Sequence, residues 1–275
     1  MRCRLIDPRY IPRGWIGTLR SAMIQSQLPS GSLRALAETL WHGVVQLVYP
    51  ATCWVCGGHV ASMGPLVCQA CRSAITEDPH STCPRCSSTV GPFINLDKGC
   101  PACRDESFAF ERALRMGPYE GPLRDVVLRM KRFGGEDLAE VVGDLWACAI
   151  APRLQAEAID VVIPVPLHWW RRWQRGFNQS EVLAHPIARV LGIPCWPTGL
   201  RCARRIAEQK ALSPTARRAN VHDAFRCSKP TALSGKTVLL VDDVMTTGAT
   251  AHETARALRV GRPARILVAV LAHGR

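Results

Sequence analysis

The clearest hydrophobic pattern in the chain is a run of four apolar residues, Val238 to Val241, which two acids follow directly. A continuous apolar run without alternation is typical of a strand buried on both faces of a parallel sheet. After a short turn, the stretch from Ala251 to Arg259 contains neither Gly nor Pro, which indicates a helix. The segment therefore predicts a strand, a turn and a helix in that order.

Other segments add elements of the same kind. Apolar residues at helical spacing predict helices over 33–48, 138–150 and 180–191. Apolar runs predict one strand that starts at 160 and another over 266–271. A turn over 119–123 leads into a further helix, which ends at 133–135. Together these elements favour an α/β fold with a parallel sheet.

The pattern divides the chain into three regions. The apolar residues of 1–32 do not recur with a sustained period, and prolines interrupt this stretch. We therefore expect a flexible N-terminal extension. Residues 33–104 combine the first helix with a cysteine-rich module. Residues 105–275 carry the α/β elements and form the expected second domain.

Eight of the thirteen cysteines form four Cys-x-x-Cys pairs, a spacing that predicts zinc binding in a long chain. Four thiolates close the coordination of one ion, so we expect about two structural Zn²⁺ ions. Sequential pairing gives the shortest loops, while alternate and nested pairings stay open. Redox chemistry is the alternative role. The predicted ligands are Cys53, Cys56, Cys68, Cys71, Cys83, Cys86, Cys100 and Cys103.

Composition and charge restrict the class of protein and the kinds of ligand that it can bind. With 47% hydrophobic residues the chain has a globular core, and no apolar run approaches the ~20 residues needed to span a bilayer. The N-terminus lacks the apolar segment of a secretory signal, so we expect a cytoplasmic protein. Of the net charge of +13, residues 162–230 carry +9, from twelve Lys or Arg against three Asp or Glu. Such a segment suits an anionic ligand, either phosphates of a small molecule or nucleic acid, although a solvated basic surface gives the same count.

The turn after the buried strand has the composition of a phosphate site. A helix N-terminus offers unpaired N–H groups and a partial positive charge, and the hydroxyls of Thr246, Thr247 and Thr250 add donors. Gly248, beside Ala249, lets the backbone approach closely. The carboxylates of Asp242 and Asp243 suit ribose hydroxyls or Mg²⁺ instead. This arrangement resembles the phosphoribosyl-pyrophosphate (PRPP) motif of type I phosphoribosyltransferases. Acids at strand ends also occur in receiver domains and nucleotide hydrolases, and they often only cap a helix.

A second polar segment follows the strand that starts at 160. It runs from a loop that prolines stiffen, through alternating Trp and Arg residues, to the helix that starts at 180. If the first polar turn binds a 5-phosphate, this segment is predicted to bind pyrophosphate. The tryptophans could stack bases, or a helix could bury them. Lys131 could also reach a phosphate, although its spacing alone favours a lysine that offsets a helix dipole. The predicted anion-binding residues are His168, Arg175, Gly176, Asn178, Gln179 and Lys131.

Residues 201–227 form a long basic insertion between predicted strands. Such an insertion is typical of a mobile hood over an anionic ligand. Its candidate ligand contacts are Gln209, Arg217, Arg218 and Asn220.

These motifs together resemble the ComF family of competence proteins, the ComFC/GntX type. The resemblance rests on Pro164-Val-Pro-Leu-His168, Arg175-Gly-Phe-Asn-Gln179, Gln209, Arg217 with Asn220, the 238–250 segment and the four cysteine pairs. It covers about 40–271. The chain departs from the family pattern at Ile206, where Thr is frequent, and at Trp169 and Trp170, where small residues or proline are common.

The resemblance implies a type I phosphoribosyltransferase fold behind a double zinc ribbon, a PRPP site with Mg²⁺, and a role in DNA uptake with single-stranded DNA and DNA-uptake proteins as partners. Asp242 and Asp243 would hold the ribose and act in catalysis, the turn at 246–250 would bind the 5-phosphate, and Arg175 with the 163–168 loop would receive pyrophosphate. Whether the chain is an enzyme stays open. The alternatives are an active phosphoribosyltransferase of nucleotide metabolism with an unknown acceptor, and a PRPP-sensing adaptor.

Overall fold

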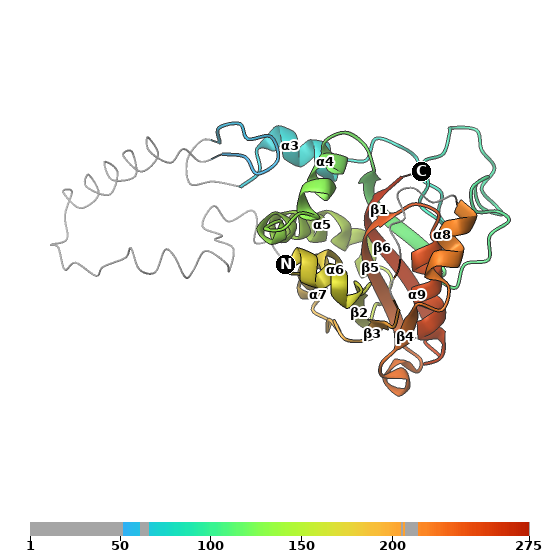
Figure 1. Ribbon diagram of the computed structural model, residues 1–275. Coiled ribbons are helices and arrows are strands. Elements are labelled where there is room, and N and C mark those ends of the chain that lie inside the picture. Colours follow the sequence, from blue (N-terminus) through green and yellow to red (C-terminus); the bar gives the residue numbers. More distant parts are fainter. Residues whose placement is uncertain (1–51, 61–65, 205, 207–213, 275) are drawn as a thin grey trace. The chain divides into compact units, whose positions relative to one another are not determined.

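The computed structural model describes residues 52–60, 66–204, 206 and 214–274 (Figure 1). The predicted extension over 1–32, the predicted helix over 33–48 and Gln209 lie outside the described residues. The chain divides into two compact units, Met1–Ser73 and Ala74–Arg275. The first four cysteines of the predicted zinc sites belong to the first unit, and the last four belong to the second.

A four-stranded parallel sheet in the order β1-β6-β5-β2 forms the centre of the second unit. Every strand is rich in apolar residues that are buried on both faces of the sheet, as the continuous runs in the sequence predict. The strands are β1 (Arg112–Pro118), β2 (Val161–Pro164), β5 (Thr237–Met245) and β6 (Arg265–His273).

Helices cover both faces of this sheet, which confirms the predicted phosphoribosyltransferase architecture. Figure 1 shows α5 and α7 on one side of the strands and α9 on the other. On the α9 side, Ala251, Ala255 and Leu258 pack with alternate residues of the strands in one buried cluster. The helices of this unit are α4 (Gly121–Met130), α5 (Glu136–Gln155), α6 (Trp169–Arg175), α7 (Gln179–Leu191), α8 (Pro214–Val221) and α9 (Ala249–Arg259).

Both outer strands of the sheet form backbone hydrogen bonds with other segments of the chain. On β1, the N–H of Ala113 donates to the carbonyl of Arg85, 2.9 Å away, in the loop that carries the second four cysteines. On β2, Val162 exchanges hydrogen bonds with the 194–196 segment. The second cysteine module is therefore built onto the sheet itself.

The remaining elements are short. Helix α3 (Gln69–Thr76) crosses the boundary between the two units. Strands β3 (Leu200–Cys202) and β4 (Phe225–Cys227) form an antiparallel pair, and a 3₁₀ turn, η3 (Pro230–Leu233), precedes β5. Among the described residues, no helix combines the length and the apolar character required to cross a bilayer.

Several boundaries differ from those that the sequence predicts. Helix α5 extends beyond 138–150 at both ends and contains Pro152 in its last turn. Strand β5 continues to Met245, so the two acids lie within the strand rather than after it. The Trp-rich segment is the helix α6, and of the two alternatives for its tryptophans the structure excludes burial within the helix packing, because α6 has no buried residue.

Candidate functional site

Asp242 and Asp243 lie near the carboxyl end of β5, at the edge where parallel sheets bind ligands. Asp242 Oδ1 accepts hydrogen bonds from the Ser180 hydroxyl and from the N–H of Asp243, both at 2.9 Å. Burial, and then the neighbouring Asp243 carboxylate, raise the pKa of Asp242 to about 7, against the lowering effect of the two hydrogen bonds. A carboxyl group with a raised pKa beside a second carboxylate at a strand end is typical of a functional site.

Lys131 compensates the negative charge of the second acid, Asp243. Its Nζ lies 3.0 Å from Asp243 Oδ2, and both side chains are largely buried. Lys131 is the C-cap residue of α4, as expected for a lysine at a helix end, yet its ammonium points at the acids of β5. In the described structure it therefore occupies the position of a counter-cation beside the carboxylates.

The turn after β5 leads directly into the N-terminus of α9. Gly248 is the N-cap residue, with φ of +75°, and the Thr247 hydroxyl accepts from the N–H of Ala249. A Cβ at Gly248 would lie 3.0 Å from Cε1 of Phe108, so both the backbone angle and the space require glycine. Thr246 and Thr250 flank this turn, and the structure thus brings all five residues of the predicted phosphate loop together at one helix start.

The side chains of Asn178 and Gln179 hydrogen-bond to backbone carbonyls of neighbouring elements. Asn178 Nδ2 donates to the Val165 carbonyl at 3.1 Å, and Gln179 Nε2 donates to the Met130 carbonyl at 3.3 Å. Arg175 donates to Gln179 Oε1 at 3.0 Å. These bonds tie the start of α7 to the end of β2 and to the end of α4, so the segment positions the site through its backbone.

His168 and Gly176 mark the two ends of α6. His168 Nδ1 accepts from the Trp170 N–H, which makes His168 the N-cap residue. Gly176 adopts φ of +86° as the C-cap, and its N–H donates to the Arg172 carbonyl. The N–H of Gly176 is thus already used within the helix, and it does not face a ligand.

Part of the predicted hood lies among the described residues. Arg217, Arg218 and Asn220 belong to α8, and Arg218 forms an ion pair with Glu106 of the cysteine-rich loop. The Arg217 side chain lies outside the described part of the structure, as does all of Gln209. The described hood residues thus lie beside the second cysteine module.

The eight cysteines form two groups in sequential order. Cys53, Cys56, Cys68 and Cys71 form one group and Cys83, Cys86, Cys100 and Cys103 the other, and within each group all four sulfur atoms lie within 4.8 Å of one another. Sulfurs around a tetrahedral zinc ion, at Zn–S of about 2.3 Å, are separated by about 3.8 Å. The distances between sulfurs are 3.9 Å for Cys56–Cys68 and 3.7 Å for Cys83–Cys103. Each group therefore fits one structural zinc ion.

One thiol in each group is disposed toward the thiolate form. Burial acts to raise the pKa of Cys53 and of Cys83, but backbone N–H donors outweigh it and lower these values to about 6 and about 7. A thiolate is the form that binds zinc. The second group is more enclosed, because all four of its cysteines are buried.

Comparison with known proteins supports both parts of this architecture. Residues 178–275 match the phosphoribosyl transferase domain family, and residues 44–104 match the double zinc ribbon domain family. The chain is 30% identical over 215 residues to the DNA utilization protein YhgH of Escherichia coli O157:H7, an alignment that covers 77% of this chain and 92% of the relative. It is 28% identical over 213 residues to the competence protein F of Haemophilus influenzae, covering 75% of this chain and 90% of the relative.

The chain belongs to the ComF family. A more distant ComF-family relative, the competence protein ComFC of Bacillus subtilis, is 23% identical over 195 residues, covering 70% of this chain and 77% of the relative.

Two contacts of this ComF-family site could not be read from the sequence. Ser180 directly follows the Arg175–Gln179 motif, and its position next to the motif is the only signal that it belongs to the site. The pairing of Lys131 with Asp243 joins residues of different elements and depends on how α4 packs on the sheet. In the described structure, Gly176 and Asn178, two of the predicted contributors, donate hydrogen bonds to backbone carbonyls.

Proposed function

We propose that this ComF-family chain binds PRPP together with Mg²⁺ at the carboxyl ends of β5 and β2. The observation that carries the proposal is the acid pair of β5 followed by the glycine-capped start of α9. The phosphate loop at 246–250 takes the 5-phosphate, and the two carboxylates take the ribose hydroxyls. The N-terminal turn of α9, with its partial positive charge and its N–H groups directed out of the helix, supplies the donors that a phosphate requires.

The magnesium of the PRPP complex fits the donor set, because carboxylates and phosphate oxygens are its preferred ligands. When bound, the ion supplies charge neutralisation between pyrophosphate and ribose oxygens. Asp242 and Asp243 are the residues placed to hold it, and Ser180 fixes the orientation of Asp242. Lys131, which pairs with Asp243 at 3.0 Å, is a cation that would also lie within reach of the pyrophosphate.

Calorimetric titration of PRPP with Mg²⁺ into the zinc-replete full chain tests the proposal. We expect micromolar binding by the wild type, and a loss of about ten- to hundredfold per acid in the Asp242→Asn, Asp243→Asn variant. Asparagine can still accept the Ser180 hydrogen bond, so the fold should survive. Asp125→Asn changes an exposed acid of α4 and serves as the control. Equal affinities in all three proteins would exclude the acids from the site.

A second function, the handling of single-stranded DNA, is favoured by the surface of α6. Trp169 and Trp173 are 67% and 73% exposed, and Trp170 lies between them with ring centroids 5.7 and 5.3 Å away. Arg171 and Arg172 interleave with these rings. Exposed aromatic rings among arginines form a stacking surface for bases with charge for the backbone.

The relatives named for competence and DNA utilization support a role in DNA uptake during natural transformation. We place that role in the cytoplasm, where incoming single strands would meet the protein and where DNA-uptake proteins would be its partners. The exposed tryptophans of α6 and the acid pair of β5 are different residues, so each set can be substituted without changing the other.

Binding of a fluorescent oligothymidine at several salt concentrations tests the DNA role. We expect the logarithm of the affinity to fall with the logarithm of salt at a slope of about −0.7 per phosphate contact. The Trp169→Ala, Trp173→Ala variant should bind at least tenfold more weakly, since each stacked base contributes about 1–3 kcal/mol. Phe93→Ala removes an even more exposed aromatic ring elsewhere and is the control. A flat salt response, or the same loss in the control, would refute this role for α6.

A further inference from the structure

An exposed aromatic ring, that of Phe133, stands on the turn between α4 and α5. Its side chain is 85% exposed. Two glycines follow it: Gly134 has φ of +77°, and a Cβ at Gly135 would lie 2.6 Å from the Met130 carbonyl oxygen. Glycine at both positions allows a turn too tight for other residues. This turn holds the ring of Phe133 outside the apolar core.

Phe133 lies beside the C-terminal end of α6. A Cβ at Gly176, the residue that ends this helix, would lie 4.0 Å from Phe133 Cε2, which is van der Waals contact. Trp173 comes three residues before Gly176 and is 73% exposed. Phe133, Trp169, Trp170 and Trp173 thus place four exposed rings from two distant segments in one region, the aromatic surface. A patch of exposed apolar side chains, unlike a single one, indicates an interaction site.

Positive charge accompanies the rings of the aromatic surface. The stretch from His168 to Gly176 contains three arginines and no acid. On the other segment, Lys131 and Arg132 directly precede Phe133. A basic surface with exposed rings is complementary to a flexible polyanion whose bases can stack, and a single strand of DNA has both properties.

The aromatic surface begins next to the cation that faces the acid pair. Lys131 Nζ lies 3.0 Å from Asp243 Oδ2, and Phe133 is two residues further along the chain, a span of at most about 7 Å. The two segments of the surface are also tied together, because Gln179 Nε2 donates to the Met130 carbonyl at 3.3 Å. The rings are therefore fixed beside the acids by the packing of α4 and α7.

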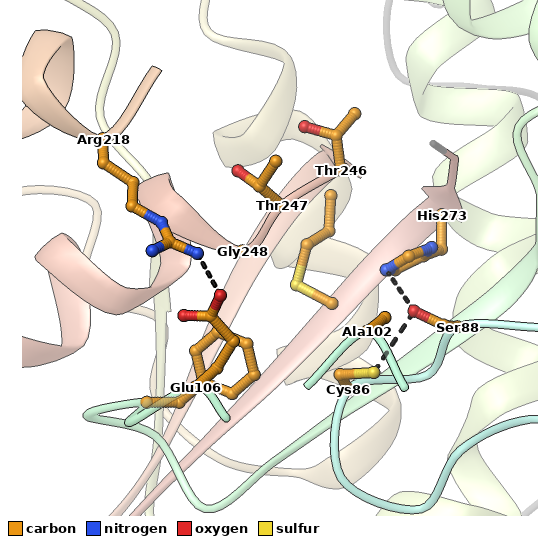
Figure 2. Close-up of a pocket in the computed structure, with 11 residues that line it drawn as sticks. Cys86, Ser88, Ala102, Glu106, Arg218, Thr246, Thr247, Gly248 and His273 are labelled. Carbon is orange, nitrogen blue, oxygen red and sulfur yellow. Dashed lines mark hydrogen bonds and ion pairs between the residues drawn. The ribbon is translucent and has the colours of Figure 1, made fainter. Parts of the chain in front are cut away.

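The phosphate loop adjoins the acids on the other side along β5. Figure 2 shows Thr246, Thr247 and Gly248 of this loop, which also form one wall of a cavity of about 430 Å³ beside His273. The described structure thus offers a phosphate loop, a pair of acids, a cation and a group of exposed rings, each next to the one before.

We infer that Phe133 and α6 form one continuous surface for a single DNA strand, and that this surface leads a 5′-phosphorylated strand end into the proposed PRPP site. The inference rests on both parts of the proposed function, and it adds which part of the strand is recognised. The terminal phosphate occupies the 246–250 loop, Lys131 faces the first phosphodiester, and the following bases stack on Phe133 and on the rings of α6.

The chemistry of a strand end matches that of PRPP. PRPP carries a phosphate, a pentose and a second phosphate group in that order, and a 5′-phosphorylated end repeats the order with its first phosphodiester as the second group. A terminal phosphate carries a charge of about −1.5 to −2 at pH 7, whereas an internal phosphodiester carries one charge. The terminal phosphate also has three free oxygens for the N–H groups of a helix start. The site therefore favours an end over the middle of a strand.

Fluorescence anisotropy of the zinc-replete full chain in Mg²⁺ buffer tests the inference. The probes are oligothymidines of about ten residues, labelled at an internal position, with a 5′-phosphate, a 5′-hydroxyl or a 3′-phosphate. We expect the 5′-phosphorylated strand to bind about tenfold tighter than the other two, because only its end gains charged hydrogen bonds in the loop. Saturating PRPP should abolish this preference and leave the affinity for the 5′-hydroxyl strand within about twofold.

Substitution of Phe133 tests the continuity of the surface. Phe133→Ala should weaken the 5′-phosphorylated strand at least fivefold, because a strand with a seated end loses the ring that stacks its neighbouring base. The 5′-hydroxyl strand can shift along α6 and should change by about twofold at most. Phe133→Tyr keeps the ring and should restore the preference. Phe93→Ala removes an exposed ring elsewhere and serves as the control. Equal losses for both strands in Phe133→Ala, or the same loss in the control, would overturn the role of Phe133.

The outcomes separate this inference from the proposed function. Equal affinities for the three strands, a preference that the 3′-phosphate shares, or a preference that saturating PRPP leaves intact overturns end recognition, while PRPP binding and strand binding stand. A preference for the 5′-phosphate without measurable PRPP binding supports the strand-end site and refutes the PRPP proposal. If PRPP binds and no strand does, the DNA role of α6 and this inference are both refuted.

Discussion

Lys131 Nζ lies 3.0 Å from Asp243 Oδ2 at the carboxyl edge of the sheet, although the two residues belong to different elements of the chain. The ion pair places a cation where two carboxylates stand side by side, and it limits the repulsion between them. Part of the negative charge of the ligand-free site is therefore already neutralised before any ligand or ion enters.

Removal of this cation should destabilise the fold. Lys131→Met leaves Asp243 with an uncompensated charge in a largely buried position, and we expect the free energy of unfolding at pH 8 to fall by about 1–3 kcal/mol. Urea denaturation measures the change. Arg124→Met breaks an exposed pair with Asp125 and should cost no more than about 0.5 kcal/mol. Equal costs for the two variants would mean that Lys131 does not balance the acids.

The raised pKa of Asp242 predicts a pH-dependent stability. Its pKa rises from an ordinary 3.8 to about 7 on folding, mainly through burial, so between these values the folded chain holds a proton that the unfolded chain has lost. This group therefore lowers stability as pH rises through that range. Asp242→Asn should raise the Tm at pH 8 and change it much less at pH 4, as measured by calorimetry. A shift of the same size at both pH values would contradict the assignment.

The two zinc groups should release their metal at different rates. All four cysteines of the second group are buried, whereas Cys56 of the first group is exposed and two more are half-buried. Total metal should be about two zinc ions per chain. A chromogenic chelator should then remove one ion quickly and the other slowly, and Cys56→Ser should abolish only the fast phase. Release in a single phase would show that burial does not control access to the zinc.

Substitution of Gly248 tests whether the space around the phosphate loop accepts a side chain. Gly248→Ala meets both a positive φ and the ring of Phe108 at 3.0 Å, whereas Gly134→Ala meets a similar φ of +77° with nothing within 4 Å. We expect Gly134→Ala to cost about 1 kcal/mol of unfolding free energy and Gly248→Ala at least twice as much. Phe108→Ala in the Gly248→Ala background should recover part of the difference. If the two alanine variants lose the same stability, the ring does not restrict the loop.

The sequence predicted the elements whose patterns are local. The apolar run at 238–241 and the helix after it appear as β5 and α9, and the cysteine spacing predicted both zinc groups. Strand β1 gave no such signal, because Arg115 interrupts its apolar pattern. That arginine is buried through its ion pair with Asp78, at 2.8 Å, which a linear pattern does not reveal.

The sequence predicted the motifs of the site but not the contacts between residues of different elements. The acids and the phosphate loop follow one another in the chain, so their proximity is visible in the sequence. Ser180 and Asp242 are 62 residues apart and meet only because α7 packs beside β5. The cavity beside His273 is closed by three further segments, namely the 245–248 turn, α8 and the loop of the second four cysteines. The periodicity of the sequence does not predict that a zinc ribbon lies against the last strand.

The hydrogen bond from Ala113 to Arg85 gives the second zinc group a protective role as well. The outer edge of β1 would otherwise present unpaired backbone groups, and an open strand edge is a template for pairing with a second copy of the chain. Arg85 lies between the zinc ligands Cys83 and Cys86, so we expect the bound metal to hold its carbonyl in position. Loss of this zinc ion should therefore first appear as self-association through β1, before the sheet itself unfolds.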